Sequence, residues 1–351
     1  MLSSRLKLWI LAAGCASAFI LVLATLVFLS YRQRATSQPL AILMYHVIED
    51  SHESLWCVPP DTFKKQIRFL YEQDYKTILP SDLVAHQAWG KPIPRKSLIL
   101  TFDDGYLSNL KIVEPILKRY GFRGIIYLIT KYVAEHPEQR QIFHGIDCLS
   151  WQEIGAMQKR GTFAFGAHSH THANLAALKN PLPEIEKSYQ QIVKHGLPAP
   201  DSFCYPYGQF NNKTIEAVRT AGFTTAMICK DKLAYTGREI NLFALPRISV
   251  IGGHHQFIAK VQFKGEKSNH VIYQVSHRGV PIEVSPELVF TNRALNALWL
   301  PSKQMNNEQV EWRWLLPDEI GKKEPFQLQI WDKYRIFPLY IDKIYVTAHS
   351  S

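Results

Sequence analysis

Concentrated charge is absent from this sequence. The chain of 351 residues has a formal net charge of +10, yet it contains no run of five or more Lys and Arg residues. A nucleic-acid groove usually shows a basic stripe with interleaved aromatic residues, so the sequence argues against a nucleic-acid partner. No internal repeat or low-complexity tract is present, and 46% hydrophobic with 20% charged residues is a globular composition.

Cysteines are few, and no two of them are spaced as Cys-x-x-Cys, which makes a structural zinc knot improbable. Cys15 lies in an apolar segment, whereas Cys57, Cys148, Cys204 and Cys229 lie beyond it. An exported location would permit zero, one or two disulfides among these four. Buried free thiols are the alternative, and the sequence does not choose between them.

One segment lacks charge altogether. Residues 8–30 form 23 consecutive uncharged residues, enough to cross a hydrocarbon core of ~30 Å as a helix. Arg5 and Lys7 precede the segment and Arg32 and Arg34 follow it. The positive-inside rule therefore gives only a weak preference for a cytoplasmic N-terminus.

Two processed forms of this segment are less consistent with the sequence. A cleaved signal peptide usually has a shorter apolar region that ends at a small-residue site, but here the long apolar run meets "YRQR". "LAAGC" before Cys15 resembles a lipoprotein cleavage site but comes too early in the apolar run. The pattern favours a retained signal-anchor, with a single pass through the cell membrane and the rest of the chain on the extracytoplasmic side.

Beyond the linker, apolar β-branched runs alternate with amphipathic helical patterns. The predicted strands are 40–46, 97–102, 123–129, 162–168, 201–207, 223–229 and 245–251. The predicted helices are 61–73, 108–121, 150–161, 182–196 and 211–222. Such alternation predicts βα units and a parallel sheet, and seven strands suit a closed or nearly closed barrel.

The pattern changes near residue 256. The segments 270–276, 310–316, 326–331 and 343–348 alternate like antiparallel strands, and no strong helical pattern intervenes. This indicates a small β-rich appended domain. Its Trp299, Trp312, Trp314 and Trp331 could stack on sugar rings, although tryptophans in a small β domain more often form its core.

Polar residues collect where the predicted parallel strands end. Reactive groups of parallel α/β folds gather at the carboxyl ends of the strands. The residues at those ends are His46, Asp103-Asp104-Gly105, His168, His170 and His172, the run 205–208 ("YPYG"), and Arg247.

The three histidines can be sorted by geometry. In an extended chain, with ~3.3 Å per residue, His168 and His172 would lie roughly 13 Å apart. That is at the limit for sharing one ion through bonds of about 2 Å. In a helical turn, residues four apart lie on one face, ~6 Å apart. A turn therefore selects His168 and His172 as ligands and leaves His170 as a neighbour.

Two histidines and one carboxylate make an open metal site. One of the adjacent aspartates would bind the metal, and the other would deprotonate the metal-bound water, since Gly105 permits the sharp turn that brings both side chains to one site. A bound metal lowers the pKa of its water toward neutrality, which is chemistry for hydrolysing an amide or ester. Non-haem iron oxygenases use the same ligand set, but on antiparallel double-sheet scaffolds, so the βα pattern argues against them.

At these residues, over roughly 40–250, the sequence resembles the polysaccharide deacetylases (the NodB-homology family, carbohydrate esterase family 4). "TFDDG" at 101–105 and "HSHTH" at 168–172 carry the resemblance, with support from "YPYG". The resemblance implies a distorted (β/α)7-type barrel. It also implies that Asp103 is the base, that Asp104, His168 and His172 hold the metal, and that the Tyr207 backbone N–H stabilises the oxyanion.

The chain departs from the family in two places. Many members have an arginine that positions the base just before Pro-Tyr-Gly, where this sequence has Cys204. Arg247 is the natural substitute. The usual late Leu-x-His, which carries the general acid, is not recognisable, and His46, or His254 and His255, would have to supply it.

"LMYH", "FCYPYG" and "LPRI" most resemble the exported poly-β-1,6-N-acetylglucosamine deacetylases. The resemblance predicts a hydrolase that removes N-acetyl groups from N-acetylglucosamine units of an exopolysaccharide or cell-wall glycan, with a divalent metal, zinc first and cobalt or nickel next. Envelope polysaccharide export or synthesis machinery is an expected partner. The alternatives are an O-deacetylase, a peptidoglycan or chitin deacetylase, and a non-catalytic glycan-binding protein.

The expected domain organisation has three parts. Residues 1–34 would form a cytoplasmic tip, a transmembrane helix and a linker. Residues 35–255 would form the deacetylase domain, and residues 256–351 the β-rich appended domain.

Overall fold

The computed structural model describes residues 37–50, 54, 56–237 and 240–250, three residues at 22, 23 and 25, and the backbone of eight strands between 258 and 344. Within these residues no helix is both long and apolar enough to span a membrane. The anchor predicted at residues 8–30 lies almost wholly outside the described residues, as does Cys15.

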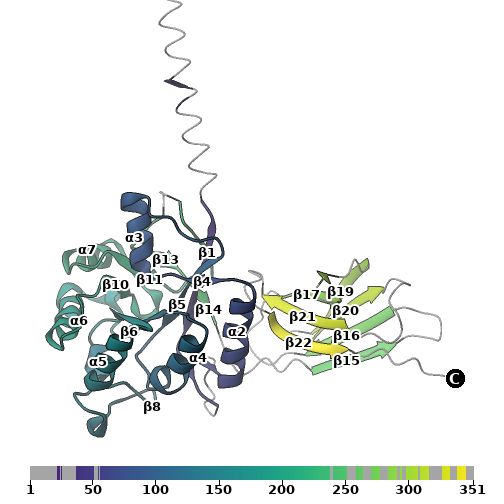
Figure 1. Cartoon of the computed structure of the whole chain (residues 1–351), viewed down its shortest axis with the longest axis horizontal. Coiled ribbons are helices and arrows are strands. Elements are labelled where there is room, and N and C mark those ends of the chain that lie inside the picture. The colour runs from purple at the N-terminus through teal and green to yellow at the C-terminus, as the bar shows by residue number, and fades with distance from the viewer. Residues whose placement is uncertain are drawn as a thin grey trace, which may run out of the picture.

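Parallel strands form a nearly closed barrel, as the sequence predicts (Figure 1). Six barrel strands follow one another in the order β1, β5, β6, β9, β10 and β11, and every neighbouring pair is parallel. Their bounds are Pro39–Tyr45, Ser97–Phe102, Gly124–Leu128, Phe163–Ala167, Ser202–Cys204 and Thr225–Ile228.

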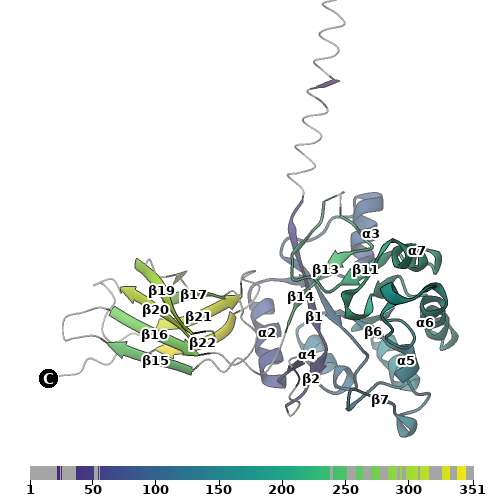
Figure 2. The ribbon, with the colours of Figure 1, turned by 180° about the vertical axis from the view of Figure 1, so that it is seen from behind.

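The seventh barrel strand closes the barrel and is divided into two short strands. β13 (Leu245–Pro246) pairs with β11, and β14 (Ile248–Ser249) pairs with β1, so the chain crosses from one edge of the sheet to the other at Arg247 (Figure 2). All seven predicted strands are thus present. Further short strands are β2 (Val47–Ile48), β3 (Cys57–Val58), β4 (Lys76–Thr77), β7 (Ile142–Phe143), β8 (Ile146–Asp147) and β12 (Ala234–Tyr235).

Alternation along β5 shows which side chains enter the barrel. Leu98, Leu100 and Phe102 join the cluster that includes Phe63 of a covering helix, whereas Ile99 joins the cluster that β1 and β11 share inside the barrel. Because successive side chains of a strand point to opposite faces, Thr101 and Asp103 continue the inward row.

Helices cover the outside of the barrel (Figure 1). They are α2 (Pro60–Glu72), α3 (Pro80–Trp89), α4 (Glu114–Arg119), α5 (Trp151–Arg160), α6 (Leu182–Lys194) and α7 (Asn212–Thr220). Short helical turns are η1 (Asn109–Val113), η2 (Thr130–Tyr132), η3 (Pro137–Gln139), η4 (Leu175–Ala177) and η5 (Pro206–Gly208).

The helix predictions are largely correct, with two differences. The single helix expected at 108–121 begins with the wider π-helical turn η1 before α4. α3 was not predicted, because it buries only Pro80 and Leu83 and so shows no repeating apolar stripe.

Beyond residue 257 the described backbone forms two four-stranded antiparallel sheets, β15-β16-β20-β19 and β18-β17-β21-β22. The strands are Ile258–Phe263, His270–Ser276, Val284–Phe290, Arg293–Ala294, Leu298–Asn306, Gln309–Leu315, Phe326–Asp332 and Pro338–Ile344. Of the strand predicted at 343–348, residues 343 and 344 belong to β22, and the rest lies outside the described residues. The domain boundaries remain predictions.

Candidate active site

Asp103 follows the last residue of β5 and points into the barrel. Its carboxylate accepts two parallel hydrogen bonds from Arg247, Nη1 to Oδ1 at 2.7 Å and Nη2 to Oδ2 at 2.8 Å. Burial would raise the pKa of Asp103, but the Arg247 guanidinium outweighs it and holds that pKa well below its usual range. Asp103 is therefore an ionised carboxylate held in a fixed orientation.

Arg247 lies where the closing strand crosses between β11 and β1. Its side chain is fully buried, and it also donates to the Thr101 hydroxyl at 3.1 Å and to the Ile228 carbonyl at 3.3 Å. The sequence indicated Arg247 as a substitute for the family arginine, and the structure brings it into direct contact with Asp103.

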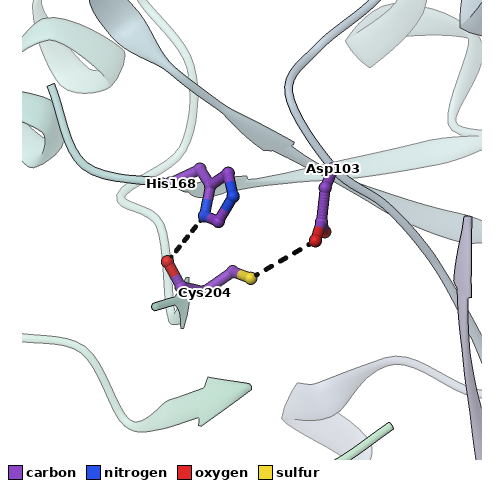
Figure 3. Close-up of side chains that lie close together, drawn as sticks. All are labelled: Asp103, His168 and Cys204. Atoms are coloured by element: carbon purple, nitrogen blue, oxygen red, sulfur yellow. Dashed lines mark hydrogen bonds between the residues drawn. The ribbon is translucent and has the colours of Figure 1, made fainter. Parts of the chain in front are cut away.

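Cys204 stands between the carboxylate and the first histidine (Figure 3). Its sulfur lies 3.6 Å from Asp103 Oδ2 and 3.1 Å from Arg247 Nη2. Its carbonyl accepts a hydrogen bond of 2.8 Å from His168 Nδ1. Because a carbonyl only accepts, His168 carries its proton on Nδ1 and presents the lone pair of Nε2 to the site.

Asp104 reaches the same site because the chain leaves the strand in a left-handed conformation. Its φ is +70° and that of Gly105 is +77°, so the alternation of the strand is broken directly after Asp103. Asp104 Oδ1 then lies 3.6 Å from His168 Nε2 and 3.8 Å from His172 Nε2. The second aspartate thus faces the histidines while the first faces Arg247.

The two histidines converge through a tight turn rather than a regular helix. Ser169 and His172 both have positive φ, and the His172 N–H donates to the Ser169 hydroxyl at 2.9 Å. His170 instead contacts the Thr130 hydroxyl through Nδ1 at 2.9 Å. This separation of His170 from the other two is the one that the spacing predicts.

The residues present fit a divalent metal. Ligand atoms of Asp104, His168 and His172 all lie within 4.8 Å of one another. Asp104 Oδ1, the oxygen that faces both histidines, is buried without a hydrogen-bond partner, a costly state for a polar atom. Burial and the neighbouring Asp103 charge raise the pKa of Asp104 to about 8, and a bound divalent cation would favour the ionised form of this carboxylate.

A second cluster fits a metal less well. Asp103, His168 and Cys204 also have ligand atoms within 4.8 Å of one another. However, Arg247 already engages both oxygens of Asp103. Burial also raises the pKa of the Cys204 thiol well above its usual value, so it is not a thiolate.

His46 lies beside Asp103, directly after the end of β1. Its Nε2 is 3.8 Å from Asp103 Oδ2, and its ring packs against Trp56 with centroids 4.6 Å apart. Burial lowers the pKa of His46 to about 4, so the imidazole is neutral at pH 7. His254 and His255, the alternatives for the acid, lie outside the described residues.

Tyr207 lies on the other side of the site, within η5. Its φ of +59° turns the backbone sharply, and its ring contacts His172 with centroids 4.6 Å apart. This position puts residue 207 beside His172, one of the three candidate metal ligands.

Sequence reasoning missed two contacts of this site. The buried Tyr106 hydroxyl donates to the Asp104 carboxylate, although only its position next to Asp-Asp-Gly hinted at this. Trp56 comes from a loop with no motif, so nothing in the sequence pointed to it. The four described cysteines, Cys57, Cys148, Cys204 and Cys229, form no disulfide with one another.

Comparison with known proteins agrees with this geometry. The family model for polysaccharide deacetylase matches residues 90–226. A poly-β-1,6-N-acetyl-D-glucosamine N-deacetylase of Staphylococcus aureus (strain MRSA252) is 26% identical over 205 residues, which are 56% of this chain and 68% of that protein.

Solved structures share the fold. The deacetylase PplD of Streptococcus pyogenes, in complex with acetate, has a TM-score of 0.55 and 22% identity, and covers 62% of this chain and 95% of its own. IcaB from Ammonifex degensii has a TM-score of 0.53 and 22% identity, and covers 60% of this chain and 91% of its own. The chain therefore contains a polysaccharide deacetylase domain. The match over residues 90–226 confirms the resemblance of the motifs to the polysaccharide deacetylases.

Proposed function

We propose that this protein is a metal-dependent deacetylase that removes N-acetyl groups from N-acetylglucosamine units of an exopolysaccharide or cell-wall glycan. The observation that carries the proposal is the division of labour between adjacent aspartates. Asp103 is ionised and held by Arg247, whereas Asp104 faces His168 and His172.

Asp104, His168 and His172 would hold the metal, most suitably zinc, with cobalt or nickel as substitutes. When bound, such an ion supplies Lewis-acid polarisation of the acetyl carbonyl and a water of lowered pKa. The histidines are prepared for this role, because burial keeps the pKa of both His168 and His172 below its usual value, in His172 at about 3.

The chain's own groups supply the proton transfers. Asp103 accepts the proton of the attacking water, while the Tyr207 backbone N–H donates to the carbonyl oxygen as that oxygen becomes negative. The carbon–nitrogen bond then breaks as the departing nitrogen receives a proton, which yields acetate and a free amine. The neutral His46 ring is placed to receive the proton that Asp103 has taken from the water and to deliver it to that nitrogen, because its Nε2 lies 3.8 Å from an Asp103 oxygen.

The substrate is proposed from the relatives. The printed name of the Staphylococcus aureus relative specifies poly-β-1,6-N-acetyl-D-glucosamine, which favours this polymer over chitin and peptidoglycan. The test is acetate release by the purified full-length chain from β-1,6-linked N-acetylglucosamine oligomers, before and after chelation and after addition of Zn²⁺, Co²⁺ or Ni²⁺. Metal-reversible acetate release supports the proposal, and release that survives complete chelation contradicts it.

The alternatives predict different substrate profiles. An O-deacetylase would release acetate from O-acetylated glycans at a higher rate, and a chitin or peptidoglycan deacetylase would prefer those polymers in a side-by-side assay. A non-catalytic glycan-binding protein would bind oligomers without turnover under any of the three metals. The pairing of Asp103 with Arg247 argues against this last alternative, because glycan binding alone does not require it.

We also propose that residues 8–30 anchor the protein in the cell membrane, with the catalytic domain on the extracytoplasmic side near envelope polysaccharide machinery. The uncharged 23-residue segment supports this. Protease added to intact spheroplasts should digest the domain, and protection from it would contradict the proposed orientation.

A further inference from the structure

We propose that Trp56 is a substrate-contact residue that packs against the pyranose ring carrying the acetyl group under attack. The inference rests on the proposed function and deepens it. It begins from an exposed aromatic side chain at the reaction centre, outside every motif that identified the site.

Trp56 is large, exposed and directly joined to the site. Its side chain and backbone keep 40% of their surface open to solvent. Its ring packs at 43° against His46, with centroids 4.6 Å apart, and His46 in turn lies 3.8 Å from Asp103. The indole therefore presents an apolar surface beside the reaction centre that the described residues leave partly uncovered.

The backbone holds this wall in a fixed position. The Val47 N–H donates to the Trp56 carbonyl at 3.3 Å, and the Trp56 N–H donates to the Ser54 hydroxyl at 3.2 Å. Directly afterwards, β3 pairs with β2 in parallel, Cys57 opposite Val47. Trp56 is therefore presented from a strand end, and presenting it costs little further ordering when a ligand binds.

Sugar chemistry matches such a surface. A pyranose ring has a face of C–H groups and a rim of polar groups, so a rigid aromatic ring covers the face while hydrogen-bonding groups read the rim. Ligand sites in general combine aromatic walls with a few convergent polar groups. Here the polar groups are Asp103 and His46, and Tyr207, 58% exposed, packs against His172 as a second exposed aromatic.

Exposure alone does not make a sugar contact, and Trp89 supplies the comparison. It is 81% exposed, but it ends α3, which leads to the amino end of β5. Asp103 follows the carboxyl end of the same strand. Trp89 thus lies at the opposite end of the barrel, and Trp89→Ala is a matched control of the same residue type.

The test compares Trp56→Ala, Trp56→Phe and Trp89→Ala in the full-length, zinc-loaded chain. Each is assayed for kcat/KM on a β-1,6-linked N-acetylglucosamine oligomer and on a small acetyl ester without a sugar, 4-nitrophenyl acetate. Trp56→Ala should lower the ratio of kcat/KM for the oligomer to kcat/KM for 4-nitrophenyl acetate about tenfold, which is the size of a lost aromatic contact. Trp56→Phe should retain most of the ratio, and Trp89→Ala should leave it unchanged.

A binding measurement makes the outcome independent of turnover. In the Asp103→Asn background, Trp56→Ala should weaken calorimetric binding of the oligomer about tenfold. If the wild-type chain releases acetate but Trp56→Ala keeps both the ratio and the affinity, Trp56 is not a sugar contact. If no acetylglucosamine substrate is hydrolysed or bound by the wild type, the proposed function itself fails.

Discussion

Arg247 and Asp103 join across the seam where the barrel closes. The two parallel hydrogen bonds, of 2.7 and 2.8 Å, link the closing strand to the end of β5. The pair serves both the fold and the site, because the same guanidinium that orients the carboxylate also fills the interior between β11 and β1.

Removing this guanidinium should therefore damage stability and activity together. Arg247→Ala leaves the buried Asp103 charge without its partner, which costs about 3–5 kcal/mol in the free energy of unfolding. Denaturant unfolding measures this loss. Arg68→Ala is the control, since it breaks the exposed pair with Glu72 and should cost much less. Equal losses for the two variants would contradict the role given to Arg247.

Gly105→Ala tests the turn that separates the two aspartates. Gly105 has φ +77°, and an added Cβ would lie 2.9 Å from Leu128 Cδ2. Gly90→Ala is the matched control, because Gly90 has φ +69° with nothing within 4 Å. Both variants pay about 1–2 kcal/mol for the left-handed conformation, but only Gly105→Ala should also lose acetate release, as Asp104 is displaced. Similar activity in both would show that the turn is not critical.

Stability without metal should depend on pH through Asp104. Burial and the neighbouring Asp103 raise the pKa of Asp104 to about 8 in the folded chain, above its usual value of 3.8. A raised pKa means that the stability from the protonated form is complete below pH 3.8 and is lost as pH rises through 8. In chelated protein, Asp104→Asn should thus raise Tm relative to wild type, and more at pH 8.5 than at pH 5. A Tm difference between the two proteins that does not change with pH would contradict the raised pKa of Asp104.

Much of the fold was predictable, for identifiable reasons. The seven barrel strands are strongly apolar and β-branched, and Asp103 directly follows one of them. The sequence therefore predicted the strand and the position of the site residue together. α3 escaped prediction because its burial pattern is weak. The sequence also did not show that β22 begins at Pro338, because alternation alone does not locate where pairing with β21 begins.

The site was predictable wherever a motif carried it. Asp103, Asp104, His168 and His172 are near one another in sequence or in a known spacing, whereas Trp56 meets His46 only through the β2–β3 pairing. Arg247 was inferred because Cys204 stands where many family members have the arginine that positions the base. The contacts of Arg247 and Cys204 with Asp103 form only when the barrel closes. Such tertiary contacts leave no periodicity in a sequence.

The central claim is that the two aspartates have different tasks, and one measurement tests it directly. Zinc content and acetate release from a β-1,6-linked N-acetylglucosamine oligomer are measured on the same samples of wild type, Asp103→Asn and Asp104→Asn. Asp103→Asn should keep its zinc and lose acetate release by a factor of about 10²–10⁴, the usual contribution of a general base, while Asp104→Asn should lose both. Full acetate release by zinc-loaded Asp103→Asn would contradict the account.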